Sequence, residues 1–152
     1  MSATGARARV AAFLAAGVLA SGGCVAPALD AGAYRQNAVA ALESARSEAR
    51  SAALAVEARL RDRLTQQYAI TLLTDHDEAL GPIEDSFGNV DPPAPDEDHL
   101  RDQVMDLLGD TSDALSTARL SVRRDDRDAL LDDLTALRQL GDRLDEAAEA
   151  LK

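Results

Sequence analysis

The chain has 152 residues with 27 acidic and 16 basic side chains, and its formal net charge is −11. A chain of this charge repels nucleic acid and anionic lipid headgroups, so we expect no nucleic-acid partner. Aromatic residues make up 3% of the chain and tryptophan is absent, which argues against a large ligand pocket.

The first 24 residues follow the order of an export signal. Arg7 and Arg9 precede an uncharged stretch at residues 10–20, and small residues at 21–23 lead to the only cysteine, Cys24. A basic, then apolar, then small-residue order is typical of a signal peptide. The cysteine at its end resembles the lipobox of bacterial lipoproteins, in which this residue is lipidated and becomes the mature N-terminus.

This resemblance covers residues 1–24 and departs from the family pattern at Ser21, where a leucine is usual. It implies a signal peptide at 1–23, a lipidated Cys24, a tether at 24–32 and attachment to the extracytoplasmic face of the cell membrane. Two alternatives remain. Signal peptidase could cut after Ala28 and remove the cysteine, or the leader could stay as a membrane span, although a span needs about 20 apolar residues.

The composition of the remaining chain points to its source. Lys152 is the only lysine, and alanine, aspartate, leucine and arginine dominate. This usage resembles that of proteins from GC-rich bacterial genomes.

A helical domain is predicted over residues 33–152. Residues 33–80 contain neither glycine nor proline and consist mostly of strong helix formers, so we predict one long helix there. Its apolar positions recur at intervals of three and four residues, an eleven-residue repeat in which a partner helix lies nearly straight. This stripe comprises Ala38, Ala41, Ala45, Ala49, Ala52, Val56 and Leu60, and continues through Leu64 and Leu72.

Glycine and proline predict a connection at residues 81–96, which begins with Gly81 and Pro82. Asp96 is the predicted N-cap of a helical arm at 97–151. The apolar stripe of this arm runs through Leu100, Val104, Leu107, Thr111, Leu115, Ala118 and Val122, and resumes as Leu130, Leu134, Leu137, Gly141, Leu144, Ala148 and Leu151.

Two all-α architectures fit this pattern. In the favoured one, residues 33–80 and 97–151 form a long antiparallel, coiled-coil-like hairpin, with the 81–96 loop at the end far from Cys24. In the alternative, the chain folds back near Asp125 to give a three-helix bundle, and the alanine-rich half of the first helix projects as a stalk. No glycine, proline or asparagine marks a turn near Asp125, which favours the hairpin.

Both histidines lie among acidic residues on either side of the predicted connection. His76 precedes Asp77, and His99 follows Asp96 by three residues. Imidazole and carboxylate groups are ligands for divalent transition metals, so His76, Asp77, Asp96 and His99 are candidate metal ligands if the loop brings them together. The other interpretation is that these acids are helix-terminal and solvated charges.

No catalytic motif accompanies these residues. The sequence has no nucleophile elbow and no phosphate-binding glycine loop. We therefore expect a non-enzymatic protein that needs no cofactor: an envelope spacer or protein-interaction module, with divalent-cation binding at the acidic loop as the alternative. Its expected partners are the membrane, through the lipid on Cys24, an envelope protein, and a further copy of the chain.

Overall fold

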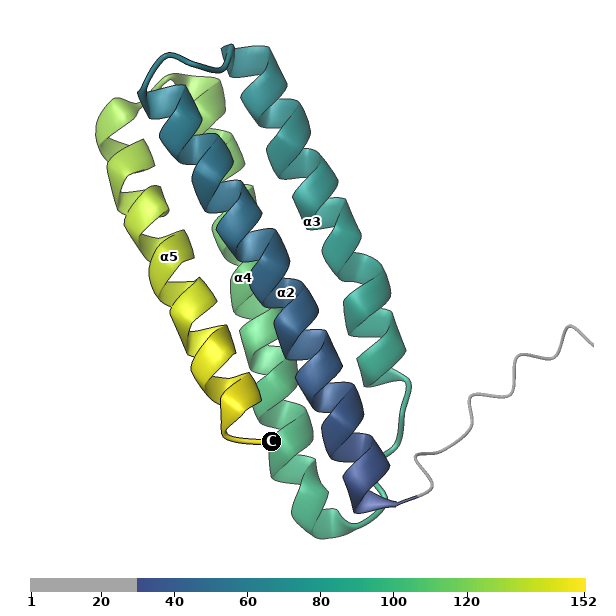
Figure 1. Ribbon diagram of the computed structural model, residues 1–152. Helices are drawn as coiled ribbons and strands as arrows, with labels where there is room; N and C mark the ends of the chain where they lie inside the picture. Colours follow the sequence, from purple (N-terminus) through teal and green to yellow (C-terminus); the bar gives the residue numbers. More distant parts are fainter. Residues whose placement is uncertain (1–29) are drawn as a thin grey trace, which may run out of the picture.

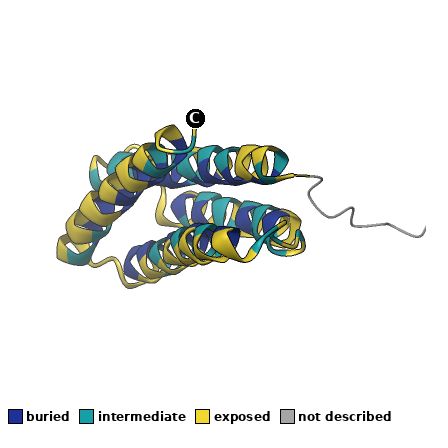
Figure 2. Cartoon of the chain, turned by 90° about the horizontal axis from the view of Figure 1, so that it is seen from below, coloured by how far each residue is buried: buried dark blue, intermediate teal, exposed yellow. Residues whose placement is uncertain are grey.

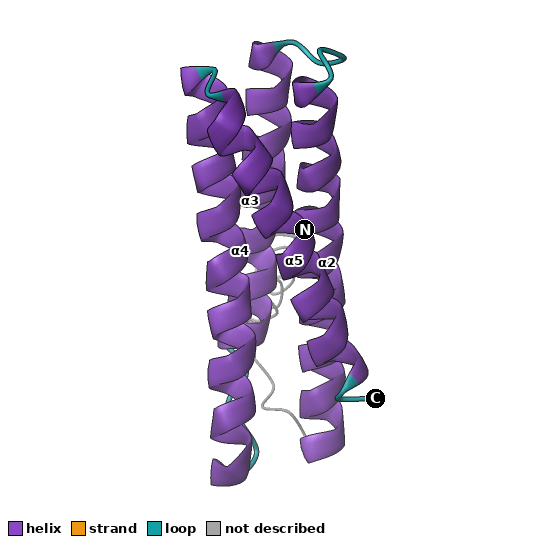
Figure 3. Ribbon diagram, turned by 90° about the vertical axis from the view of Figure 1, so that its left-hand side faces the viewer, coloured by secondary structure: helices purple, strands orange, loops and turns teal. Residues whose placement is uncertain are grey.

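The computed structural model describes residues 30–152, and all its regular elements are helical, which confirms the all-α prediction. Four helices form the bundle in Figure 1: α2 (Ala31–Leu60), α3 (Gln66–Gly88), α4 (Asp98–Arg124) and α5 (Arg127–Glu149). A 3-10 turn, η2 (Pro95–Glu97), precedes α4. Successive helices run antiparallel and pack as neighbours, as short connections require (Figure 3). Within residues 30–152, no helix is long and apolar enough to cross a membrane.

The predicted hairpin is wrong because both of its arms break. The first arm divides at residues 61–65, and the second divides at 125–126. The three-helix alternative placed the second turn correctly, but its stalk is wrong as well. One face of α2 is buried along nearly the whole helix, since α2 packs against α3, α4 and α5.

An aspartate in the left-handed backbone region makes each of these two turns. Asp62 has φ 55° and Asp125 has φ 54°. Aspartate tolerates this region better than most residues, so the chain reverses without glycine. A side-chain cap then restarts the helix: Thr65 accepts from a backbone N–H of α3, and Asp126 does the same for α5.

The two turns lie side by side at one end of the bundle, which we call the far end. Arg59 forms ion pairs with both Asp62, at 3.1 Å, and Asp125. The Gln66 amide donates to the carbonyl of Val122 at 2.8 Å, so α3 begins against the last turn of α4.

The predicted connection at 81–96 is shorter in the structure, because α3 continues through Pro82 to Gly88. Proline removes one backbone donor, but its fixed φ is compatible with a helix. A residue before proline usually leaves the helical region because its Cβ meets the ring. Gly81 has no Cβ, which removes much of this steric conflict.

Three of the predicted apolar faces are the buried faces. The alanines and Val56 of the α2 stripe are buried, as are most stripe positions of α4 and α5. Leu64 and Leu72, however, are only partly buried, because the turn at 61–65 resets the helical phase. α3 instead buries Ala69, Leu73, Leu80 and Phe87.

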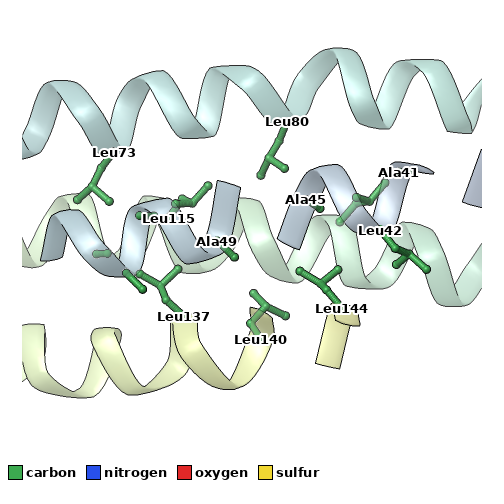
Figure 4. Close-up of a cluster of buried hydrophobic side chains, with 14 of the residues drawn as sticks. Ala41, Leu42, Ala45, Ala49, Leu73, Leu80, Leu115, Leu137, Leu140 and Leu144 are labelled. Carbon is green, nitrogen blue, oxygen red and sulfur yellow. The ribbon is translucent and has the colours of Figure 1, made fainter. Parts of the chain in front are cut away.

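The core lies where all four helices meet, with buried residues facing inward (Figure 2). Figure 4 shows the small side chains of α2 between Leu73 and Leu80 of α3 and the leucines of α5. Small residues let three helices approach α2 closely. At Gly141 of α5, an added Cβ would lie 3.1 Å from Cγ of Arg50 on α2.

Candidate functional site

The end of the bundle opposite the two turns, the base end, joins three parts of the chain. It carries Asp30, the N-cap of α2, together with the α3–α4 connection and the C-terminus (Figure 1). Arg35 of α2 forms an ion pair with Glu97 at 2.9 Å, and Lys152 forms one with Glu43 at 2.9 Å. The connection therefore lies beside the start of α2, whereas the hairpin placed it at the opposite end. Cys24, the predicted lipidation site, is outside the described residues.

Acidic residues are concentrated in the base half. Residues 78–110, which form the second half of α3, the connection and the first half of α4, contain ten carboxylates and a single arginine, Arg101. The far end instead gathers arginines at or beside its turns: Arg59, Arg61, Arg63, Arg123, Arg124 and Arg127. The base half consequently carries most of the negative potential and favours cationic partners.

His76 and Asp77 lie midway along α3 and link it to different neighbours. Nδ1 of His76 lies 2.7 Å from Oε2 of Glu48 on α2, and both side chains are half-buried. Asp77 accepts a hydrogen bond from Ser112 at 2.9 Å and lies 3.6 Å from the Arg119 guanidinium, both on α4. These contacts hold helices together.

Asp96 and His99 lie at the base end instead. They line an open hollow of about 330 Å³ together with Glu97 and Arg35. His76 is twelve residues from the end of α3, roughly 18 Å along the helix axis. The structure therefore does not bring the four candidate metal ligands together. Within residues 30–152 no group of three or more His, Cys, Asp or Glu side chains is placed to hold a metal ion.

Glu97 is the buried carboxylate of the base end, with 4% of its surface exposed. It occupies the N-cap position of α4 but makes no side-chain cap, so the predicted N-cap at Asp96 is wrong. Its partner is Arg35, 62 residues away along the chain. No local sequence signal could have identified this pair, because only the packing of α2 beside η2 brings the two residues together.

Tyr34 closes the core beneath this pair. Its ring lies 5.4 Å from that of Phe87, measured between centroids, and its side chain is fully buried. Burial raises the pKa of the Tyr34 hydroxyl, which has no hydrogen-bond partner among the described residues. A buried, unpaired hydroxyl costs free energy, so Tyr34 is held there by ring packing.

No protein-family model, characterised protein or solved structure matches this chain. At the base end most charged side chains are carboxylates. Four of them are paired: Glu97 with Arg35, Glu43 and Glu149 with Lys152, and Asp91 with Arg101. Such an arrangement suits the electrostatic attraction of basic groups on another molecule.

Proposed function

We propose that this protein is an exported lipoprotein, anchored to the extracytoplasmic face of the cell membrane through a lipid on Cys24. There it acts as a non-enzymatic protein-interaction module that also spaces its partner from the bilayer. The observation that carries the proposal is the leader that ends in Cys24, six residues before the helix cap Asp30.

The length of this tether supports a role close to the membrane. Six residues span at most about 20 Å, even when fully extended. α2 has 30 residues and is therefore about 45 Å long. With the base end tethered, the far end would stand up to about 65 Å from the lipid surface.

Replacing Cys24 tests the anchor. Cys24→Ala should abolish incorporation of a fatty-acid probe and move the protein from the membrane fraction to the soluble fraction. Ser21→Leu, which restores the usual lipobox residue, is the matched control and should keep both labelling and membrane association. Equal labelling of wild type and Cys24→Ala would refute the proposal. A mature wild-type chain that begins at Leu29 would show cleavage after Ala28 and would also refute it.

A further inference from the structure

A groove runs between α2 and the second half of α3. It contains an open hollow of about 350 Å³. Small residues of α2 line one side, and apolar residues of α3 line the other: Ala40, Ala41, Ser44, Ile83, Phe87 and Val90. The groove is open because α2 presents alanine and serine where larger side chains would fill the space.

The outward face of α2 continues this groove and carries no charged residue; Glu48, at its boundary with α3, is paired with His76. Its outward positions recur at intervals of three and four residues, and most are well exposed: Asn37, Ala40, Ser44, Ser47, Ser51 and Leu54. Leu54 is 65% exposed. Charged residues make up 28% of the chain, so a charge-free face along its longest helix is a distinct surface. A helix can pack there without removing water from a charged group.

The α3 edge of this groove is acidic. Pro82 lines the hollow, and the exposed residues Asp75, Glu78 and Asp85 lie seven and four residues before it and three after it. At these spacings they share the outer face of α3 with Pro82, and none takes part in an ion pair within residues 30–152. The opposite edge is different, because Arg46 and Arg50 of α2 are paired with Asp145 of α5. The hydrogen bond from Arg46 lowers the pKa of Asp145, which keeps this carboxylate ionised. One edge of the groove therefore offers uncompensated negative charge.

We propose that the α2–α3 groove binds an α-helix of a partner protein. The small apolar face of that helix packs on Ala40 and Ser44, and a row of lysine or arginine residues lies over the acidic α3 edge. The spacing of the α2 face matches the helix–helix packing of coiled coils. A second copy of this chain is a poorer occupant, because two strongly acidic molecules would face each other. This proposal rests on the proposed interaction role and names the chemistry of the partner.

Peptide binding to the full chain in detergent tests the proposal. The probe is a labelled 21-residue amphipathic helix with alanine and leucine on its contacting face and arginine along one edge. A matched peptide carries glutamate in place of arginine. Fluorescence anisotropy at low and high salt should show binding of the arginine peptide, at least about tenfold weaker binding of the glutamate peptide, and loss of affinity with salt.

Two variants locate the bound peptide. Ala40→Phe fills the hollow and should weaken binding by about tenfold or more. The triple variant Asp75→Asn, Glu78→Gln and Asp85→Asn should weaken binding by about tenfold and remove most of its salt dependence.

Matched controls lie on the opposite side of the bundle. Ala136→Phe places the same ring on an exposed position of α5, beside a hollow shared with α4. The charge control is a triple variant at exposed carboxylates that are likewise outside the ion pairs of residues 30–152: Asp106→Asn, Asp113→Asn and Asp132→Asn. Both controls should bind the arginine peptide like wild type, and circular dichroism should show unchanged helix content in every variant.

Three outcomes would overturn the proposal. One is that the arginine peptide fails to bind. Another is that the glutamate peptide binds as tightly as the arginine peptide, or that the control variants weaken binding as much as the groove variants do. The third is a dimer in sedimentation experiments that Ala40→Phe dissociates, which would assign the groove to a second copy. Failure of Cys24 labelling would remove the membrane anchor but leave peptide binding intact, so the two proposals fail separately.

Discussion

The two aspartates in the left-handed backbone region, Asp62 and Asp125, allow a test of the two far-end turns. At each position the glycine variant should be more stable than the alanine variant if the chain turns there, and less stable if the helix is continuous. We compare Asp62→Gly with Asp62→Ala, and Asp125→Gly with Asp125→Ala. Both members of each pair remove the same carboxylate, so the lost contacts with Arg59 cancel in the comparison. What remains is the backbone preference at φ 55° and φ 54°.

The expected difference follows from two opposing terms. Placing an L-residue such as alanine in the left-handed region destabilises the fold by roughly 1–2 kcal/mol, and glycine, which has no Cβ, adopts this conformation without that penalty. Glycine loses about 0.5–1 kcal/mol more conformational entropy on folding than alanine. Glycine should therefore be more stable than alanine by about 1 kcal/mol at each position, a difference of about 3–5 °C in Tm for a domain of this size.

Urea unfolding followed by circular dichroism measures this difference directly. In a continuous helix, the free energy of unfolding of the alanine variant would instead exceed that of the glycine variant by about 1 kcal/mol, so the hairpin predicts the opposite sign. An alanine variant as stable as or more stable than its glycine counterpart at both positions would refute the turns. The single variants are compared separately, since both positions share Arg59 and their effects need not add.

Two further substitutions test a glycine within α4 and a half-buried carboxylate of α5. Gly109 lies within α4, where an added Cβ would meet no atom within 4 Å, so Gly109→Ala should raise the free energy of unfolding by about 0.5–1 kcal/mol; destabilisation would contradict a regular helix there. Burial raises the pKa of the Asp133 carboxyl above its usual value, and one of its oxygens has no hydrogen-bond partner within residues 30–152. The ionised form is thus disfavoured in the fold, and Asp133→Asn should stabilise the protein near neutral pH, with a gain that shrinks as pH falls through the raised pKa and is lost below about 4. Asp132→Asn, at an exposed neighbour, is the control, and a gain that persists at low pH would contradict this cause.

Helical periodicity predicted most of the buried faces because burial within a helix depends only on local spacing. The stripe at 38–60 is buried in α2, and the stripes before and after Asp125 are buried in α4 and α5, although the predicted pairing of the helices was wrong. A face that suits a hairpin partner also suits a bundle, since both remove the same apolar surface from water.

The turns could not be predicted in the same way. Asp62 and Asp125 reverse the chain with residues that also occur in helices, while Gly81 and Pro82, the strongest breaking signal, lie inside α3. Glycine and proline were therefore poor turn signals here: they lie inside a helix, and the two turns contain neither. The predicted convergence of the four candidate metal ligands is not seen for a related reason. It required the connection to begin at residue 81, but α3 continues and leaves His76 far from His99, paired with Glu48 across the groove.

The charge distribution connects the tether to the groove. If Cys24 carries the lipid, the acidic base half faces the bilayer, and anionic headgroups repel it over about one Debye length, roughly 8 Å at physiological salt. The tether reaches about 20 Å, so the base end can remain beyond this layer while still anchored. The α2–α3 groove runs along the side of the bundle and is not covered by the membrane in that position. Under the two proposals, spacing and partner binding are therefore compatible roles of one structure: the acidic base would keep the bundle off the lipid, and the acidic α3 edge would attract a basic helix to the exposed side.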